Sequence, residues 1–214
     1  MLVSKVMTKN PICIDPDSSL VEAQSLMDKE KVKYLPVLDN NNSLVGIITR
    51  EDLAKAGPSA ATTLDMYEIS YLLSKMKVSE VMVQKVITID QDEAIEEAAR
   101  VMADKGIDSL PVMKGSVLTG IVTDTDLFNL FLSIFGQRYK GIRIVLSIEE
   151  KPGIIAAISA AIAERGGNII SYVSSEGEDV AHRRNTIKIK GIAKEELEMI
   201  FKRLPGVVLE DIRG

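Results

Sequence analysis

Residue types that commonly build catalytic and metal sites are scarce in this chain of 214 residues. It has no tryptophan, one cysteine and one histidine, and aromatic residues make up only 4% of it. A lone cysteine, Cys13, cannot form an intramolecular disulfide, and no Cys- or His-rich set with metal-ligand spacing exists. We therefore expect an aliphatic core, no metal site and a reducing cytoplasmic location.

Long apolar runs and an excess of basic residues are also lacking. The longest apolar stretch, 127–135, is too short for a membrane-spanning helix, which needs about 18 residues or more. The formal net charge is -5, whereas nucleic-acid binding requires clustered Lys and Arg to neutralise phosphates. We expect neither a membrane nor a nucleic acid as partner.

Catalytic machinery is not visible in the sequence either. His182 lies in the polar segment 176–185, where a solvated loop residue is expected, and no phosphate-cradling G-x-x-x-x-G-K is present. Hydrolytic or transfer chemistry needs a base, a nucleophile or a metal assembled in one pocket. The sequence therefore predicts a binding or regulatory protein and not an enzyme.

What the chain does contain is an internal repeat over its first two thirds. Three motifs recur in the same order and register: V-M, L-P-V and G-h-h-T-x-x-D-L, where h is aliphatic. They are Val6-Met7, Leu35-Pro36-Val37 and Gly46 to Leu53 in one copy, and Val81-Met82, Leu110-Pro111-Val112 and Gly120 to Leu127 in the other.

Each copy predicts the order β-α-β-β-α. Asp17 and Asp92 precede the first helix of each copy as expected N-caps, and apolar residues at helical spacing give that helix one buried face. A connecting helix is expected over 64–76. One copy alone has too little surface to bury, so we expect the two copies to pack together.

These three motifs resemble the CBS motif, and two copies in tandem resemble a CBS pair over residues 1–135. We assign 1–60 to the first CBS repeat, 61–78 to the connecting helix and 79–135 to the second repeat. The resemblance implies that an adenine nucleotide binds in clefts between the repeats.

The Thr and Asp of the last motif are suited to that role by their own chemistry. Thr49 and Thr123 end strands beside helix starts, where a hydroxyl suits a phosphate oxygen, and glycines at 46 and 120 allow close approach in buried strands. Asp52 and Asp126 can accept hydrogen bonds from a ribose diol. Threonine is also an ordinary N-cap and Asp a stabilising first-turn residue, so both interpretations remain open.

The resemblance implies two clefts, each combining the Thr and Asp of one repeat with residues of the other. One would hold Thr123, Asp126, Thr8, Cys13, Lys33 and Tyr34, and the other Thr49, Asp52, Thr88, Asp108 and Ser109. Because Lys33 attracts phosphate and Asp108 repels it unless a cation or Arg50 offsets its charge, we expect the Thr123 cleft to bind nucleotide more tightly. Many family members carry Arg where this chain has Glu51 and Thr125, which favours AMP over ADP or ATP and leaves S-adenosylmethionine open.

The C-terminal third predicts β-α-β-β-α-β, a ferredoxin-like order. Its segments Glu150 to Gly153 and Arg165 to Ile169 resemble those of an ACT domain, here over 141–214. That resemblance implies edge-to-edge pairing into a homodimer and an amino-acid effector site at Glu150, Gly153, Gly167 and Asn168. Glu150 replaces the usual short Asp or Asn of the turn, so pairing alone is an equal alternative.

The whole arrangement, an α+β chain with a CBS pair before an ACT domain, resembles acetoin-utilisation accessory proteins, including the segment 58–75 between the repeats. The resemblance implies a ligand sensor that regulates an unidentified metabolic enzyme. A scaffold with unused clefts is the alternative. Phe128, Phe131 and Phe135 at helical spacing predict a core stripe, or else a packing surface between protomers or domains.

Overall fold

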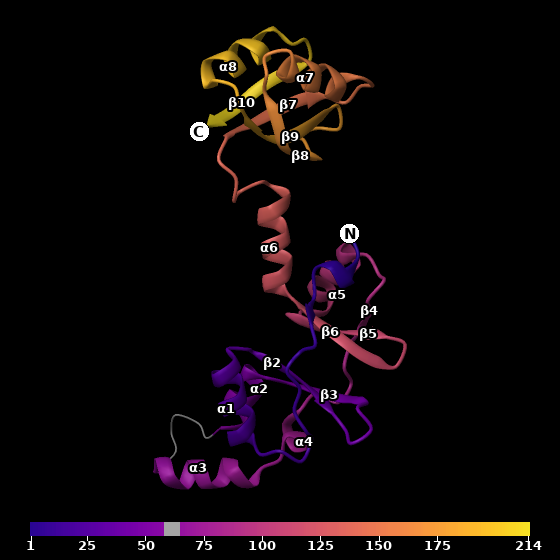
Figure 1. Cartoon of the computed structure of the whole chain (residues 1–214), viewed down its shortest axis with the longest axis vertical. Coiled ribbons are helices and arrows are strands. Elements are labelled where there is room, and N and C mark those ends of the chain that lie inside the picture. Colours follow the sequence, from indigo (N-terminus) through magenta and orange to yellow (C-terminus); the bar gives the residue numbers. More distant parts are fainter. Residues whose placement is uncertain (58–64) are drawn as a thin grey trace. The chain divides into compact units, whose positions relative to one another are not determined.

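The computed structural model describes residues 1–57 and 65–214, apart from the side chain of Met66. The chain folds as two units, 1–127 and 128–214. The first contains both repeats and the second contains the C-terminal β-α-β-β-α-β segment (Figure 1). The expected helix start at Leu64, and residues 58–64 of the acetoin-protein resemblance, lie outside the described residues.

The first repeat has the expected order, with a short helical turn before it. Helix α1 begins after Ser19, whose hydroxyl accepts from the Glu22 amide while the Glu22 carboxylate accepts from the Ser19 amide. This reciprocal cap replaces the expected cap Asp17, which instead pairs with Lys77 at 2.7 Å. The elements are η1 (Val3–Lys5), β1 (Thr8–Lys9), α1 (Leu20–Glu30), β2 (Tyr34–Leu38), β3 (Leu44–Thr49) and α2 (Arg50–Ala56).

The second repeat follows a connecting helix, α3, which is capped by Asp65. Helix α5 begins after Ala94, so the expected cap Asp92 is also displaced by two residues. Helix α6 crosses the boundary between the two units. The elements are α3 (Met66–Lys75), α4 (Val78–Val81), β4 (Ile89–Asp90), α5 (Ile95–Lys105), β5 (Ser109–Lys114), β6 (Val117–Thr123) and α6 (Asp124–Ile134).

The first segment of each repeat pairs with a strand of the other repeat. Strand β1 pairs antiparallel with β6, with Thr8 opposite Ile121, so the sheet order is β1-β6-β5-β4. In the reverse direction, Val83 exchanges two backbone hydrogen bonds with Ile47 of β3, at 3.0 and 2.9 Å. The two repeats of the first unit are therefore joined by exchanged backbone segments as well as by side chains.

Two close methionine–glycine contacts hold these exchanged segments in place. A Cβ at Gly120 would overlap the Sδ of Met7, and a Cβ at Gly46 would overlap the Sδ of Met82. In both cases the methionine belongs to one repeat and the glycine to the other. The expected need for glycine in these strands is confirmed.

The core of the first repeat is aliphatic, as expected. Leu35 and Val37 of β2 are fully buried, and they pack with Leu20 and Met27 on the inner face of α1. Val78, which follows the connecting helix, completes this cluster. The first repeat therefore depends on a residue at the start of the second.

The second unit is a four-stranded antiparallel sheet with two helices, in the expected ferredoxin-like order. Both helices cover one face of the sheet (Figure 1), where Ile144, Leu146, Ile158, Ile187 and Phe201 form the centre of the core. The strand order is β10-β7-β9-β8. The elements are β7 (Ile142–Glu149), α7 (Ile154–Ala163), β8 (Asn168–Glu176), β9 (His182–Lys190), α8 (Lys194–Arg203) and β10 (Val207–Arg213).

The phenylalanine stripe is not a core stripe. Phe128 is 66% exposed and Phe131 is 55% exposed. The ring centroids of Phe131 and Phe135 lie 4.5 Å apart, so these two rings contact each other on α6 and just after it. The core interpretation is therefore wrong for Phe128 and Phe131.

Among the described residues, no helix is both long enough and apolar enough to cross a membrane.

Alanine at Gly120 should destabilise the protein more than alanine at Gly46. At both positions the new Cβ meets a methionine that can move, but at Gly120 it would also lie 2.9 Å from the backbone oxygen of Thr8. Because overpacking costs about 1–3 kcal/mol, we expect Gly120→Ala to lose about 2 kcal/mol and Gly46→Ala under about 1 kcal/mol. Urea unfolding followed by circular dichroism measures both, and equal losses would contradict the exchange geometry.

Candidate functional site

A cavity of about 630 Å³ lies between the two repeats of the first unit. Its wall combines the end of β3 and the start of α2 with residues 83–87, the start of β5 and the first residue of α6. Six of the residues expected from the sequence line it: Lys33, Tyr34, Thr49, Asp52, Asp108 and Ser109.

Thr49 and Asp52 form a reciprocal helix cap at the edge of this cavity. The Thr49 hydroxyl donates to Asp52 Oδ2 at 2.7 Å, the Thr49 amide donates to the same oxygen at 2.9 Å, and the Asp52 amide donates to the hydroxyl at 3.1 Å. The capping interpretation of this motif is thus correct. Within the described part of the chain Oδ1 of Asp52 has no hydrogen-bond partner, so it can still accept from a ligand.

Thr123 and Asp126 repeat this geometry in the second copy. The Thr123 hydroxyl and amide donate to Asp126 Oδ2 at 2.8 and 2.9 Å. Neither residue lines the cavity at Thr49, and Thr8, Cys13 and Thr88 do not line it either.

Cys13 is a half-buried free thiol. Its Sγ donates to the Pro11 carbonyl oxygen at 3.2 Å. Burial raises the pKa of the Cys13 thiol, because the thiolate loses its hydration. The thiol therefore stays protonated near neutral pH and is a poor nucleophile.

The structure corrects the expected positions of Lys33 and Tyr34. Both were assigned to the cleft of Thr123, but both line the cavity of Thr49 and Asp52. The reason is the hairpin register: Tyr34 lies directly opposite Thr49, and the Lys33 carbonyl accepts from the Arg50 amide at 2.9 Å. In the first repeat the residues before L-P-V therefore lie beside the Thr and Asp of their own repeat, and Asp108 and Ser109 of the second repeat line the same cavity.

Tyr34 brings a hydroxyl to the wall shared by the two repeats. Burial, followed by the charges of Asp124 and then Asp108, raises the pKa of Tyr34 to about 12. Ser109, equivalent to Tyr34 in the second repeat, is buried and also lines the cavity. Besides Thr49, each repeat thus contributes one residue with a neutral hydroxyl group to the cavity wall.

Sequence reasoning missed two charged residues of the wall, Lys85 and Asp124. The repeat register held the signal for Asp124, because it occupies the position of Arg50 in the second copy. Lys85 lies three residues before the expected Thr88, in the segment that follows the exchanged Val83. The backbone path after Val83 determines that Lys85, and not Thr88, lines the cavity.

A second candidate site lies at the turn between β7 and α7. Glu150 and Gly153 line a hollow of about 610 Å³ together with Ser174 and Arg183. Gly167 and Asn168, at the other end of α7, do not line it. The four expected effector residues are therefore split into two pairs within one chain.

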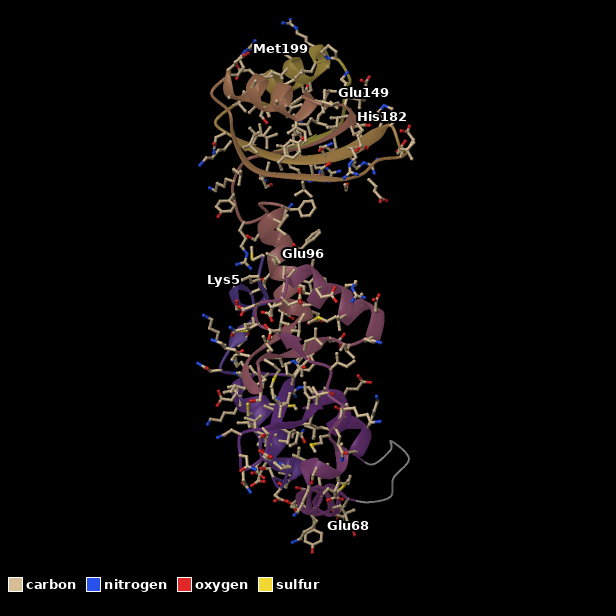
Figure 2. All side chains as sticks on the ribbon, turned by 90° about the vertical axis from the view of Figure 1, so that its right-hand side faces the viewer. Lys5, Glu68, Glu96, Glu149, His182 and Met199 are labelled. Carbon is tan, nitrogen blue, oxygen red and sulfur yellow. The ribbon has the colours of Figure 1, made fainter. Side chains whose placement is uncertain are left out.

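His182 lies on a strand and not in the expected loop. It begins β9 directly opposite Glu149, and Figure 2 shows the two side chains close together. Its Nδ1 lies 2.8 Å from Asp179 Oδ1. Across residues 1–57 and 65–214, no group of three or more His, Cys, Asp or Glu could hold a metal ion.

The two copies of the repeat match a known family model. A model described as the CBS domain matches residues 3–59 and 78–133, more than half of the chain. The chain belongs to the CBS-domain family. The cavity at Thr49 and Asp52 is therefore a cleft of a tandem CBS pair.

One curated relative of this CBS pair is the L-aspartate semialdehyde sulfurtransferase of Methanocaldococcus jannaschii. It is 32% identical over 131 residues, which cover 61% of this chain and 23% of that protein. The chain thus spans less than a quarter of that relative's length. The similarity concerns a small part of that enzyme.

Three solved structures share the CBS-pair fold. The CBS domain pair of protein MJ0100, in complex with 5′-methylthioadenosine and S-adenosyl-L-methionine, is 31% identical with a TM-score of 0.52, and the match covers 65% of this chain and 98% of that one. CBSX2 in complex with AMP is 29% identical, TM-score 0.51, covering 62% and 97%. A protein of Vibrio cholerae assigned to acetoin utilization (AcuB) is 27% identical, TM-score 0.54, covering 65% and 98%.

The ionisation of Tyr34 should be observable by ultraviolet titration. The folded-state pKa of about 12 exceeds the ordinary value of 10, so the stabilisation by neutral Tyr34 is complete below pH 10 and is lost as the pH rises toward 12. The phenolate absorbance of the parent chain minus that of Tyr34→Phe isolates this residue. We expect a midpoint near 12 that falls in Asp124→Asn, and a midpoint at or below 10 would contradict the burial of Tyr34 and the placement of the carboxylates beside it.

Proposed function

We propose that this chain is a regulatory ligand-sensing protein whose cavity at Thr49 and Asp52 binds an adenosyl ligand. The observation that carries the proposal is that this Thr–Asp pair borders a cavity lined by both repeats. Its volume of about 630 Å³ falls within the range of about 300–1,000 Å³ of small-molecule sites.

The wall chemistry suits an adenosine. Oδ1 of Asp52 can accept hydrogen bonds from a ribose diol, and the hydroxyls of Tyr34 and Ser109 can bond polar edges of a base. Ile47, Val83 and Ile87 offer apolar surface to the flat faces of the purine.

Relatives support the adenosyl class of ligand. The CBS pair of MJ0100 binds 5′-methylthioadenosine and S-adenosyl-L-methionine, and CBSX2 binds AMP. By the internal repeat we also propose a second, equivalent site at Thr123 and Asp126, with Thr8 and Cys13 from the first repeat. Its hydrogen bonds match those at Thr49 and Asp52.

Regulation follows from a ligand that contacts both repeats. A ligand shifts a conformational equilibrium only by its differential affinity for the two states, and a cleft between two repeats changes whenever the repeats move. We propose that a homodimer transmits this change to a metabolic enzyme partner. The chain itself performs no catalysis in this proposal.

The second unit supplies a second candidate function, that of an ACT-like domain that pairs with its own copy and responds to an amino acid. The hollow at the start of α7 favours it, because Arg183 can bind a carboxylate and Glu150 an ammonium group. Gly167 and Asn168 would join this site from a second protomer.

Thermal unfolding with and without ligand tests the main proposal. A ligand that binds only the folded state raises the melting temperature, so 5′-methylthioadenosine, S-adenosylmethionine, AMP, ADP and ATP are each added to the full chain. We expect at least one of these ligands to raise the melting temperature. Asp52→Asn should lower the affinity for that ligand about tenfold or more, because the ribose loses a charged hydrogen-bond acceptor.

Asp65→Asn is the matched control, because Asp65 also caps a helix through its side chain but does not line the cavity. It should cost similar stability while leaving the affinity of the Thr49 cavity largely unchanged. A chain whose melting temperature responds to none of these ligands would be a scaffold, contrary to the proposal.

A further inference from the structure

We infer that the Thr49 cavity selects adenosyl ligands whose 5′ group is uncharged or cationic, as in a thioether or sulfonium, over phosphorylated ones. The inference rests on the proposed function and concerns the class of ligand at the same site. It is carried by the difference in exposure between the carboxylates and the cations of the cavity wall.

The less exposed charged groups of the wall are carboxylates. Asp52 and Asp124 are both half-buried, whereas the cations Lys33, Arg50 and Lys85 are exposed. Exposed charges are screened by water and salt much more than partly buried ones. A ligand inside the cavity therefore experiences the negative charges more strongly than the positive ones.

Arg50 is also committed to another partner. Its Nη1 lies 2.6 Å from Oδ1 of Asp28, which does not line the cavity, and its Nη2 donates to the Val32 carbonyl at 3.4 Å. This pairing neutralises the guanidinium. Glu51 is likewise paired, with Lys55 at 2.8 Å. Lys33 and Lys85 remain as cations against Asp52, Asp124 and the exposed Asp108.

The carboxylates also act on Tyr34. Burial is the largest cause of the raised pKa of its hydroxyl, and Asp124 and Asp108 raise this pKa further because a phenolate beside them would be repelled. A phosphate dianion would meet the same repulsion when placed near this wall.

The apolar part of the wall acts in the same direction. Ile47, Val83, Val86 and Ile107 line the cavity, and burying a charged phosphate against apolar side chains without a paired cation is costly. A methylthio group loses little on leaving water there, and a sulfonium is attracted by the carboxylates. Discrimination thus comes from repelling the wrong ligand as well as binding the right one.

Isothermal titration calorimetry of the full chain with four ligands tests this order. We expect 5′-methylthioadenosine and S-adenosylmethionine to bind at least about tenfold more tightly than AMP, with ATP weakest. Tighter or equal binding of AMP would overturn the inference while leaving the proposed function in place. Binding of none of the four would overturn both.

Charge-removing variants assign the selectivity to the wall. Asp124→Asn should lower the Kd for AMP and raise the Kd for S-adenosylmethionine, so that the ratio of the two Kd values shrinks about tenfold. Asp108→Asn should act in the same direction. Asp92→Asn is the control, because Asp92 carries the same charge in the same repeat and does not line the cavity. An equal effect of Asp92→Asn, or an unchanged ratio in Asp124→Asn, would overturn the inference.

Salt gives the same test without a substitution. Raising sodium chloride from about 50 to about 500 mM shortens the Debye length severalfold. We expect the higher salt to lower the affinity for S-adenosylmethionine and to leave the affinity for 5′-methylthioadenosine, which is neutral, nearly unchanged. The affinity for AMP should rise relative to that for 5′-methylthioadenosine. Weakening of AMP by salt would show net attraction of its phosphate and would overturn the inference.

Discussion

The contact between a methionine of one repeat and a glycine of the other is the constraint on which the first unit depends. Met7 at Gly120 and Met82 at Gly46 let the start of each repeat lie against the last hairpin strand of its neighbour. The bridge between Val83 and Ile47 then carries residues 83–87 onto the cavity wall. Without this exchange the cavity would lose one side.

The Thr–Asp motif serves the fold and the site with different atoms. Oδ2 of Asp52 completes the cap of α2, and Oδ1, which no described residue occupies, can accept from a ligand. The structural and functional interpretations of this motif, which compete at the level of sequence, are therefore compatible. A side chain held by two local hydrogen bonds is also preorganised, so a ligand has little conformational entropy to offset.

The order of elements could be predicted because it depends on local periodicity and on the repeat. Which cleft Lys33 and Tyr34 line could not be predicted, because it depends on which residue lies opposite Thr49 across a hairpin. Strand β9 begins at His182, earlier than expected, because the polar residues at its start pair with β7 and β8 through their backbones. The exposure of Phe128 is likewise invisible in its spacing, which is identical for a core and for a surface.

The exchange of β1 has a consequence for the order of events during synthesis. Thr8 leaves the ribosome long before its partner Ile121, which lies near the far end of the CBS pair. Such non-local pairing is slow to form, because a long loop must close before the contact is made. The nascent chain must therefore keep its leading segment unpaired until the second hairpin has been made, and a single repeat released early would present an open sheet edge to other chains.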